Sequence, residues 1–312
     1  MKILIIGAGA LGGYFGGRLL AAGRDVTFLV RQGRAEQLAA TGGLIVKSPN
    51  GDFTIENPPL VRADALKGPY DLALLACKST GLDSCIRDMA PAMGPETKIL
   101  PLLNGMRHME VLEKAFGRDR LLGGRCFIFA TLDAEGRVLH QSPLATLDFG
   151  RPDGGITPET EAIHAALDGA GFTATLNPDI MQGMWEKWVL IACVAGSTCL
   201  MRAAIGDIVN AGGLAFQTAL LGETSAVAAA NGHPLPPEFM EKLQTMLADA
   251  ASVQSSSMHK DMEKGLPIEA DQIIGDMIAR MGGAGNGKTP LLELIYLHLK
   301  AYEVRRERGG LA

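Results

Sequence analysis

The chain has 312 residues, 47% hydrophobic and 20% charged, a composition typical of a folded protein with a sizeable core that excludes a disordered one. Its formal net charge is −5 and it contains no long basic run, so we expect no nucleic-acid partner. No apolar run reaches the roughly 18–20 residues of a membrane-spanning helix, and a strand beginning at Ile3 leaves no room for a secretion signal, so we expect a cytoplasmic protein that has no membrane partner.

The beginning of the chain predicts a βαβ unit that binds a dinucleotide. The apolar strand Ile3–Ile6 is followed by Gly7, Gly9 and Gly12 in a G-x-G-x-x-G pattern, then by a helix and a second strand, Val26–Val30. Gly7 permits the tight turn, Gly9 lets the backbone approach a pyrophosphate, and Gly12 lets the helix pack closely on the strand. The N–H groups at the start of the helix can then bind the phosphates.

Arg31 stands at the end of the second strand, where an Asp or Glu would bind the ribose 2′-hydroxyl of NAD. An arginine at this position suits a 2′-phosphate instead, and Arg34 lies nearby in the sequence. The first segment therefore predicts an NADP-binding Rossmann domain.

Strands and helices continue to alternate through the N-terminal half, which predicts a parallel sheet with helices on both faces. Further strands are expected at residues 43–47, 71–76 and 98–103. Residues 121–131 and 137–148 flank a Glu-Gly turn and indicate a hairpin of antiparallel edge strands.

From about residue 180 the chain predicts long helices rich in Ala, Leu and Met, broken by Gly and Pro. The predicted fold class is an α/β Rossmann-type N-terminal domain plus an all-α C-terminal domain. The boundary is expected near Asn177-Pro178, because the residue before a proline resists the helical conformation. Residues 1–178 would then bind NADP, and residues 179–312 would form a helical substrate and catalytic domain.

Two polar residues follow strand ends, where ligands bind in sheets of this kind. Lys78 follows the strand at 71–76, and Asn104 follows the strand at 98–103. Lys78 could equally be a solvated loop lysine. Asn104 could be a turn former ahead of Gly105, although its position is the one where a nicotinamide would lie.

Lys187 lies in the segment 184–194, which is predicted to be a helix with apolar residues on all sides. A helix of this kind is buried, and the lysine would stand at its start. One interpretation is a first-turn lysine that extends to water. The other is a partly desolvated lysine that acts as a general acid.

A third polar cluster comprises the serines 255–257 with Asp261 and Glu269. Ser257 and Asp261 are four residues apart, which places them on one helix face. Glu269 is expected just inside the next helix, where a carboxylate complements the helix dipole. A structural role is the default for this glutamate, and the three serines are expected within a helix, where they could simply face solvent.

Residues 282–289 satisfy the pattern G-x-x-x-x-G-K-[ST] of a phosphate-binding loop. Such a loop needs a buried strand before it. The preceding residues 271–281 have apolar residues at helical spacing instead, so we expect a flexible loop between helices and no bound nucleoside triphosphate.

Five cysteines, an odd number without C-x-x-C spacing, predict reduced and mostly buried thiols at positions 77, 85, 126, 193 and 199. No metal site is expected.

Taken together, these residues resemble the ketopantoate reductase family (2-dehydropantoate 2-reductases) over nearly the whole chain. The interval of twelve residues from Ser257 to Glu269 matches the spacing in that family. The resemblance implies a Rossmann domain joined to a helical domain, with the active site in the cleft between them. It rests on Gly7–Gly12, Arg31, Cys77-Lys78, Leu103-Asn104-Gly105-Met106, Trp185-Glu186-Lys187, Ser256-Ser257-Met258, Asp261 and Glu269.

The resemblance also implies a reaction, the reduction of a 2-oxo acid by NADPH, and first of all that of 2-dehydropantoate to pantoate in pantothenate biosynthesis. Lys187 would stabilise the ketone oxygen and donate the proton. Asn104 would bind near the reacting centre and position substrate and nicotinamide. Glu269 would orient the substrate or the lysine, and Ser257 would hold the substrate carboxylate.

For the cofactor NADP(H), the resemblance implies that Arg31 holds the 2′-phosphate. Lys78 would lie beside the cofactor and interact with Glu269 or the ribose. The helical domain could supply the interface of a homodimer. The full set of implied cofactor-binding positions is Gly7, Ala8, Gly9, Ala10, Leu11, Gly12, Arg31, Lys78 and Asn104.

Two positions depart from the family pattern. Family members usually carry asparagines one and two helical turns after the lysine, where this chain has Ile191 and Ala195. Without such groups the pocket is more apolar and discriminates less against substrates that lack a hydroxyl. Three outcomes stay open: 2-dehydropantoate held by other groups such as Gln254 or Ser256, a different branched 2-oxo acid as substrate, or a non-catalytic NADP-binding sensor.

Overall fold

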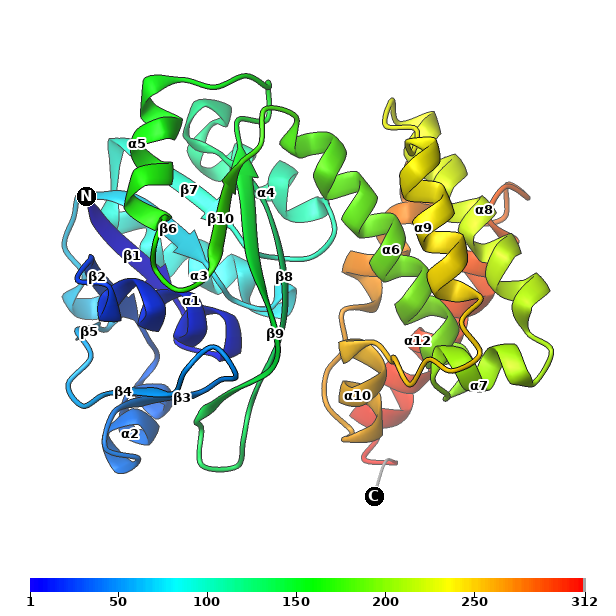
Figure 1. The fold of residues 1–312 in the computed structure, drawn as a ribbon, viewed down its shortest axis with the longest axis horizontal. Coiled ribbons are helices and arrows are strands. Elements are labelled where there is room, and N and C mark those ends of the chain that lie inside the picture. Colours follow the sequence, from blue (N-terminus) through cyan, green and yellow to red (C-terminus); the bar gives the residue numbers. More distant parts are fainter. Residues whose placement is uncertain (311–312) are drawn as a thin grey trace. The chain divides into compact units, whose positions relative to one another are not determined.

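The computed structural model describes residues 1–310, which divide into two compact units. The first unit comprises Met1–Leu103 and His108–Met181, and the second comprises Asn104–Arg107 and the chain from Gln182 onward. Figure 1 shows strands flanked by helices in the first unit and helices in the second. The predicted fold class is therefore confirmed. Asn104 belongs to the helical unit together with the three residues that follow it, although the chain on either side of Asn104–Arg107 belongs to the first unit.

A parallel sheet forms the centre of the first unit, with its strands in the order β5-β2-β1-β6-β7. The chain moves outward from β1 to β2 and β5, then returns to the other side of β1 as β6. This reversal places the carboxyl ends of β2, β1 and β6 side by side, which is where open α/β sheets bind ligands. The strands are β1 (Lys2–Ile6), β2 (Asp25–Leu29), β5 (Leu60–Val61), β6 (Tyr70–Leu75) and β7 (Met93–Pro101).

A second sheet lies in the same unit, in the order β10-β9-β3-β4, with β8 paired to β9. The predicted hairpin is confirmed, because β8 and β9 are antiparallel. The expectation of two edge strands is wrong for β9, which pairs with β8, β3 and β10. The residues near 43–47 join this sheet and not the parallel one. Its strands are β3 (Leu44–Lys47), β4 (Phe53–Ile55), β8 (Gly123–Leu132), β9 (Val138–Gly150) and β10 (Thr173–Leu176).

Helix α1 (Ala10–Ala21) packs against both sheets. A Cβ atom on Gly16 would lie 2.6 Å from the Phe28 ring in the parallel sheet, and one on Gly13 would lie 2.8 Å from the Val138 side chain in the second sheet. Larger residues would push the sheets away, because packed interiors have no spare volume. Glycines at these positions therefore let α1 lie close to both sheets.

The remaining helical segments of the first unit are short. Thr157 caps one of them, α5, through a reciprocal hydrogen-bond pattern with Thr160. The segments are α2 (Gln32–Ala40), η1 (Ala63–Ala65), η2 (Ser79–Gly81), α3 (Leu82–Met89), η3 (Ala90–Ala92), α4 (Arg107–Phe116), η4 (Arg118–Arg120) and α5 (Pro158–Leu167).

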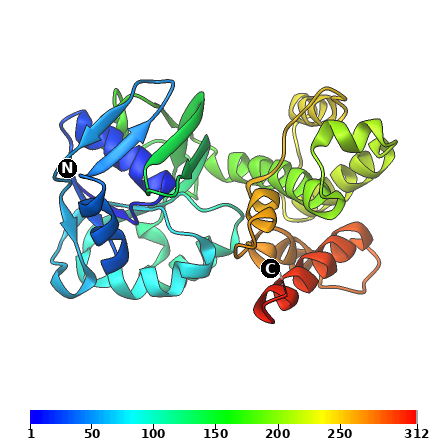
Figure 2. The same cartoon turned by 90° about the horizontal axis from the view of Figure 1, so that it is seen from below.

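The second unit is built on a long central helix, α6. Helix α9 lies alongside α8, and α12, drawn in red, adjoins the orange segment that contains η5 (Figures 1 and 2). Segment η5 is a π-helical turn that continues directly into α11. The elements are α6 (Ile180–Met201), α7 (Ile205–Asn210), α8 (Leu214–Ala230), α9 (Pro237–Leu247), α10 (Ser257–Glu263), η5 (Asp271–Gly275), α11 (Asp276–Arg280) and α12 (Pro290–Glu307).

Helix α6 is long and apolar enough to cross a membrane by length and composition alone. No continuous apolar run marks it in the sequence, because Gln182, Glu186 and Lys187 interrupt the apolar residues. Within the structure 67% of its most apolar stretch is buried. A helix covered by its own chain on most sides is a core helix.

Candidate active site

The glycine-rich turn between β1 and α1 has the geometry that a dinucleotide requires. Gly7 has a φ of +95°, which favours glycine. A Cβ on Gly12 would lie 1.9 Å from the carbonyl oxygen of Gly7, so only glycine allows the helix to approach the turn this closely. Beside Gly9 no atom lies within 4 Å of an added Cβ. The space there is open to an approaching ligand.

The first turn of α1 also fits a phosphate group. Gly9 stands at the N-cap position with no side-chain hydrogen bond to the helix, and the first turn contains no acidic residue. The first N–H groups of a helix have no partner within that helix, and they lie at the positive end of its dipole. A pyrophosphate can satisfy these donors, so the residues fit the NADP(H) that the sequence predicts.

Arg34 supports this turn from α2. Its Nε donates to the carbonyl oxygen of Ala8 at 2.7 Å, and its Nη1 donates to that of Gly136 at 2.9 Å and to Oε1 of Gln37 at 2.6 Å. Burial lowers the pKa of this guanidinium below its ordinary value. The bonds assign Arg34 to the backbone of the glycine turn, a role that its proximity to Arg31 in the sequence did not suggest.

Arg31 occupies the N-cap position of α2, directly after β2, and its side chain is exposed. Its Nη2 donates to Oγ of Ser84 at 2.5 Å, and Ser84 donates in turn to the carbonyl oxygen of Gly81 at 2.9 Å. Arg31 is thereby held against the segment η2–α3, which begins next to Lys78. Lys78 is also exposed and follows β6. The glycine turn, Arg31 and Lys78 thus follow three neighbouring strands, β1, β2 and β6.

Asn104 lies in a turn that is fastened to η5 within the second unit. The side-chain Nε2 of Gln272 donates to the carbonyl oxygen of Asn104 at 2.8 Å. The next residue, Gly105, has a φ of +76°, and a Cβ there would lie 2.7 Å from the carbonyl oxygen of Gln272. The turn interpretation of Asn104 and a site role are therefore compatible, since the backbone forms a turn that Gln272 holds in place.

Lys187 is buried in α6, with 9% of its surface exposed. It lies about two turns from the start of the helix at Ile180. The first-turn position expected from the sequence is therefore wrong. The next residue, Trp188, is fully buried, and its Nε1 donates to the carbonyl oxygen of Ile273 in η5 at 3.0 Å. The helix is thus joined to η5 one residue away from the lysine.

Glu269 directly precedes the helical segment that begins at Ala270, and its carbonyl oxygen accepts a hydrogen bond from the N–H of Ile273 at 3.0 Å. It therefore stands just before the helix and not just inside it. The backbone around η5 consequently connects the neighbourhoods of Asn104, Lys187 and Glu269. The prediction of a helix over residues 271–281 is confirmed, but the π-helical form of its first part has no sequence periodicity that could have revealed it.

Ser257 is the first residue of α10 and is exposed. Ser256 precedes it as the N-cap, and its Oγ accepts from the N–H of His259 at 3.0 Å and lies 3.0 Å from Oγ1 of Thr198 on α6. The expectation of three serines within one helix is therefore wrong, because Ser255 and Ser256 lie outside it. Ser256 fixes the start of α10 to α6, which leaves Ser257 as the serine at the surface.

Ile191 and Ala195 follow Lys187 by one and two turns of α6. Ile191 is half-buried and Ala195 is buried. Neither side chain carries a hydrogen-bonding group, so this part of the α6 surface is apolar where the family pattern is polar.

The Gly-rich segment 282–289 connects α11 to α12, as predicted, and no strand precedes it. The carboxylate of Glu223 accepts hydrogen bonds from the N–H groups of Leu291 and Leu292, at 2.9 and 3.0 Å. These are the donors that a phosphate would need at the start of α12. A side chain of the protein therefore occupies the place of the anion.

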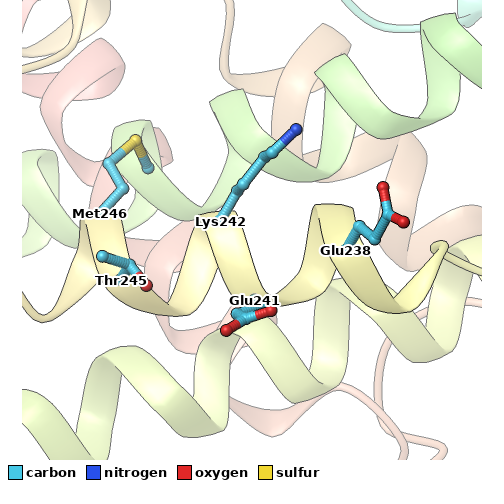
Figure 3. Close-up of a pocket in the computed structure, with 5 residues that line it drawn as sticks. All are labelled: Glu238, Glu241, Lys242, Thr245 and Met246. Atoms are coloured by element: carbon cyan, nitrogen blue, oxygen red, sulfur yellow. The ribbon is translucent and has the colours of Figure 1, made fainter.

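A shallow surface pocket lies along α9 (Figure 3). All of its lining side chains come from that one helix, and it includes none of the predicted site residues. They are Glu238, Glu241, Lys242, Thr245 and Met246. Within residues 1–310, no cluster of three His, Cys, Asp or Glu side chains is arranged to hold a metal ion.

Two family models match the chain: ketopantoate reductase PanE/ApbA over residues 3–154, and the C-terminal domain of ketopantoate reductase PanE/ApbA over residues 179–303. An uncharacterized oxidoreductase, YkpB of Bacillus subtilis, is 37% identical over 308 residues, which cover 98% of this chain and 100% of the relative. A 2-dehydropantoate 2-reductase of Nostoc sp. is 28% identical, with 99% and 98% coverage.

Among solved structures, the 2-dehydropantoate 2-reductase from Methylococcus capsulatus has a TM-score of 0.85 to this chain at 29% identity, with 98% of each chain covered. Both halves of the chain match models of one family. The relative from Nostoc sp. and the structure from Methylococcus capsulatus, which match nearly the whole chain, bear the name of the same enzyme. The chain therefore belongs to the ketopantoate reductase family and is an NADP-dependent oxidoreductase.

Proposed function

We propose that the protein reduces a branched 2-oxo acid to the 2-hydroxy acid with NADPH, and that 2-dehydropantoate is the first substrate to test. The observation that carries the proposal is the set of hydrogen bonds made by η5. There, Gln272 bonds to the turn of Asn104, and the residue after Lys187 bonds to the helix that follows Glu269. The backbone segments that carry Asn104, Lys187 and Glu269 are thus all connected to η5.

The cofactor, when bound, supplies the hydride that reduces the ketone carbon. In the proposed reaction the Nζ of Lys187 stabilises the negative charge on the ketone oxygen and donates the proton to it. The side-chain amide of Asn104 orients the ketone, and Glu269 orients the substrate or Lys187. The hydroxyl of Ser257, exposed at the start of α10, binds the substrate carboxylate.

On the cofactor side, the uncapped start of α1 binds the pyrophosphate. Arg31 binds the 2′-phosphate through a guanidinium already oriented by Ser84, and Lys78 binds beside it. The exposure of both cations supports this assignment, because a charged ligand can reach them. Arg34 contributes indirectly, by holding the Ala8 carbonyl.

A second candidate substrate class is a branched 2-oxo acid without the hydroxyl of 2-dehydropantoate. The observation that favours it is the apolar surface at Ile191 and Ala195. Buried polar groups reject substrates that leave them unpaired, whereas an apolar wall imposes no such penalty. The substrate range should therefore extend to acids whose branched chain is purely aliphatic.

The test is a panel of 2-oxo acids, among them 2-dehydropantoate and 2-oxoisovalerate, assayed with NADPH and with NADH by loss of nicotinamide absorbance. Turnover of 2-dehydropantoate, with NADPH preferred, supports the first candidate. Turnover of the aliphatic acids alone supports the second. Tight NADPH binding without turnover of any acid contradicts both and indicates a sensor. Equal affinity for NADH and NADPH would overturn the role of Arg31.

A further inference from the structure

We propose that Gln272 is a positioning residue of the active site, which sets the direction of the Asn104 side chain by holding the backbone of its turn. The inference rests on the proposed function, in which Asn104 contacts the substrate. Gln272 itself touches neither substrate nor cofactor in this account and acts only through Asn104.

The contact between the two residues is close and shielded from water. Gln272 is 5% exposed, and its Nε2 donates to the carbonyl oxygen of Asn104 at 2.8 Å. On the other side of the turn, a Cβ at Gly105 would lie 2.7 Å from the carbonyl oxygen of Gln272. The turn is therefore held by a hydrogen bond before Gly105 and by backbone packing at Gly105. Because the Cα of Asn104 is part of this held backbone, the position from which its amide extends is fixed.

The segment that carries Gln272 is itself anchored on two sides. Asp271 accepts from the hydroxyl of Tyr296 at 2.6 Å and from Nζ of Lys300 at 3.2 Å, both on α12. Ile273 accepts from Trp188 on α6 at 3.0 Å. Three consecutive residues of η5 thus bond in turn to α12, to the Asn104 turn and to α6.

Segment η5, which makes these contacts, is π-helical. A π-helical turn contains an extra residue and so changes the direction of the side chains within it, and such turns are frequent at functional sites. In η5, three successive residues bond to three different parts of the second unit. Gln272 is the member whose side chain reaches a predicted substrate-binding residue.

The test compares Gln272→Leu, which keeps the size of the side chain and loses the donor, with Gln217→Leu as a matched control. Gln217 is also buried in the helical unit, with 1% exposed, but lies on α8 and is bonded to no site residue. We expect Gln272→Leu to lower kcat about 10- to 100-fold, with little change in KM or in the Kd for NADPH, because a small misplacement of a positioning group acts on the transition state. Gln217→Leu should keep the kcat of the unmodified protein.

A double-variant cycle with Asn104→Ala separates the possible failures. If Gln272 acts through Asn104, the double variant should be no slower than Asn104→Ala alone. Near-normal kcat in Gln272→Leu beside an inactive Asn104→Ala would overturn this inference and leave the proposed function intact. Normal activity in Asn104→Ala would overturn this inference and the role proposed for Asn104, and would leave the proposed reaction intact. If Gln272→Leu does not fold, Gln272→Glu, which keeps the shape and loses the donor when ionised, takes its place with the same expected loss in kcat.

Discussion

At the scale of single residues, the proposed site combines one buried cation with two exposed ones. Lys187 is buried in α6, whereas Arg31 and Lys78 are exposed at strand ends. Burial suits a group that transfers a proton at a place from which water is excluded. Exposure suits cations that capture a charged cofactor from solution.

Replacing Lys187 by Ala should lower kcat by roughly two or more orders of magnitude, because the ketone oxygen loses both its charge stabilisation and its proton donor. Lys242→Ala, at an exposed position on α9 (Figure 3), provides the control for the loss of a lysine. Steady-state kinetics with the best acid of the substrate panel measures both. A Lys187→Ala variant with near-normal kcat would return the lysine to a structural role.

The glycine turn allows folding and cofactor binding to be separated. Gly9→Ala adds a methyl group into open space, so the melting temperature should not change, whereas the Kd for NADPH should rise at least tenfold because the methyl group blocks the approach of the pyrophosphate. Gly33→Ala on α2 also meets no neighbour, and it should change neither property for the worse. Scanning calorimetry measures the melting temperature of both variants, and titration calorimetry measures their Kd for NADPH. An unchanged Kd in Gly9→Ala would show that the pyrophosphate does not approach the backbone at Gly9.

The thiols should differ from one another in their reactivity toward an alkylating reagent, because their pKa values differ. Burial raises the pKa of Cys193 and of Cys199 to about 12, from an ordinary value of 9.0. A hydrogen bond from Cys77 contributes most to the lowered pKa of Cys85. At pH 8, iodoacetamide should therefore label Cys85 before Cys193 or Cys199, as read by peptide mass spectrometry.

The same two raised pKa values have a consequence for stability. Above pH 9.0 the unfolded chain loses the protons of Cys193 and Cys199, which the folded chain keeps up to about 12. The free energy of unfolding should therefore fall as the pH rises through this range. Labelling of Cys193 in the native protein as early as that of Cys85 would show that the pKa of Cys193 is not raised, and would contradict both the order of labelling and this pH dependence of stability.

At the scale of elements, regular periodicity was enough to predict most of the fold. The parallel strands, the hairpin and the helices after residue 180 follow from runs and spacings of apolar residues. Strands β4, β5 and β10 have only three, two and four residues, too few to show a pattern. The second sheet was also missed, because β3 and β9 pair through contacts between residues 46–47 and 138–139, which no local pattern records.

Helix α12 gives a prediction about capping. Glu223, from α8, binds the N–H groups of Leu291 and Leu292 and so satisfies the start of the helix. Glu223→Ala should lower the free energy of unfolding by about 1–2 kcal/mol, the usual range for the loss of a cap. Urea denaturation measures this change, and Glu223→Gln, which keeps one acceptor oxygen, should lose less. An alanine variant as stable as the original would show that the cap is replaced by water.

At the scale of the whole molecule, the resemblance of scattered motifs located the candidate residues, but not the bonds that hold them. Asn104 and Gln272 are 168 residues apart, and their hydrogen bond could not be read from either segment. The hydrogen bond between Trp188 on α6 and Ile273 in η5 likewise connects residues that are distant in the sequence. A single sequence contains local periodicity and motif spacing, whereas long-range polar bonds depend on the completed fold.

The central claim is that a hydride passes from NADPH to the carbonyl carbon of a 2-oxo acid in this protein. It is tested most directly with NADPH that carries deuterium at both C4 positions of the nicotinamide, followed by mass spectrometry and NMR of the acid product. The account predicts one deuterium atom, at C2 of the resulting 2-hydroxy acid, and loss of this product in Lys187→Ala. Oxidation of the NADPH without deuterium in any organic acid would contradict it.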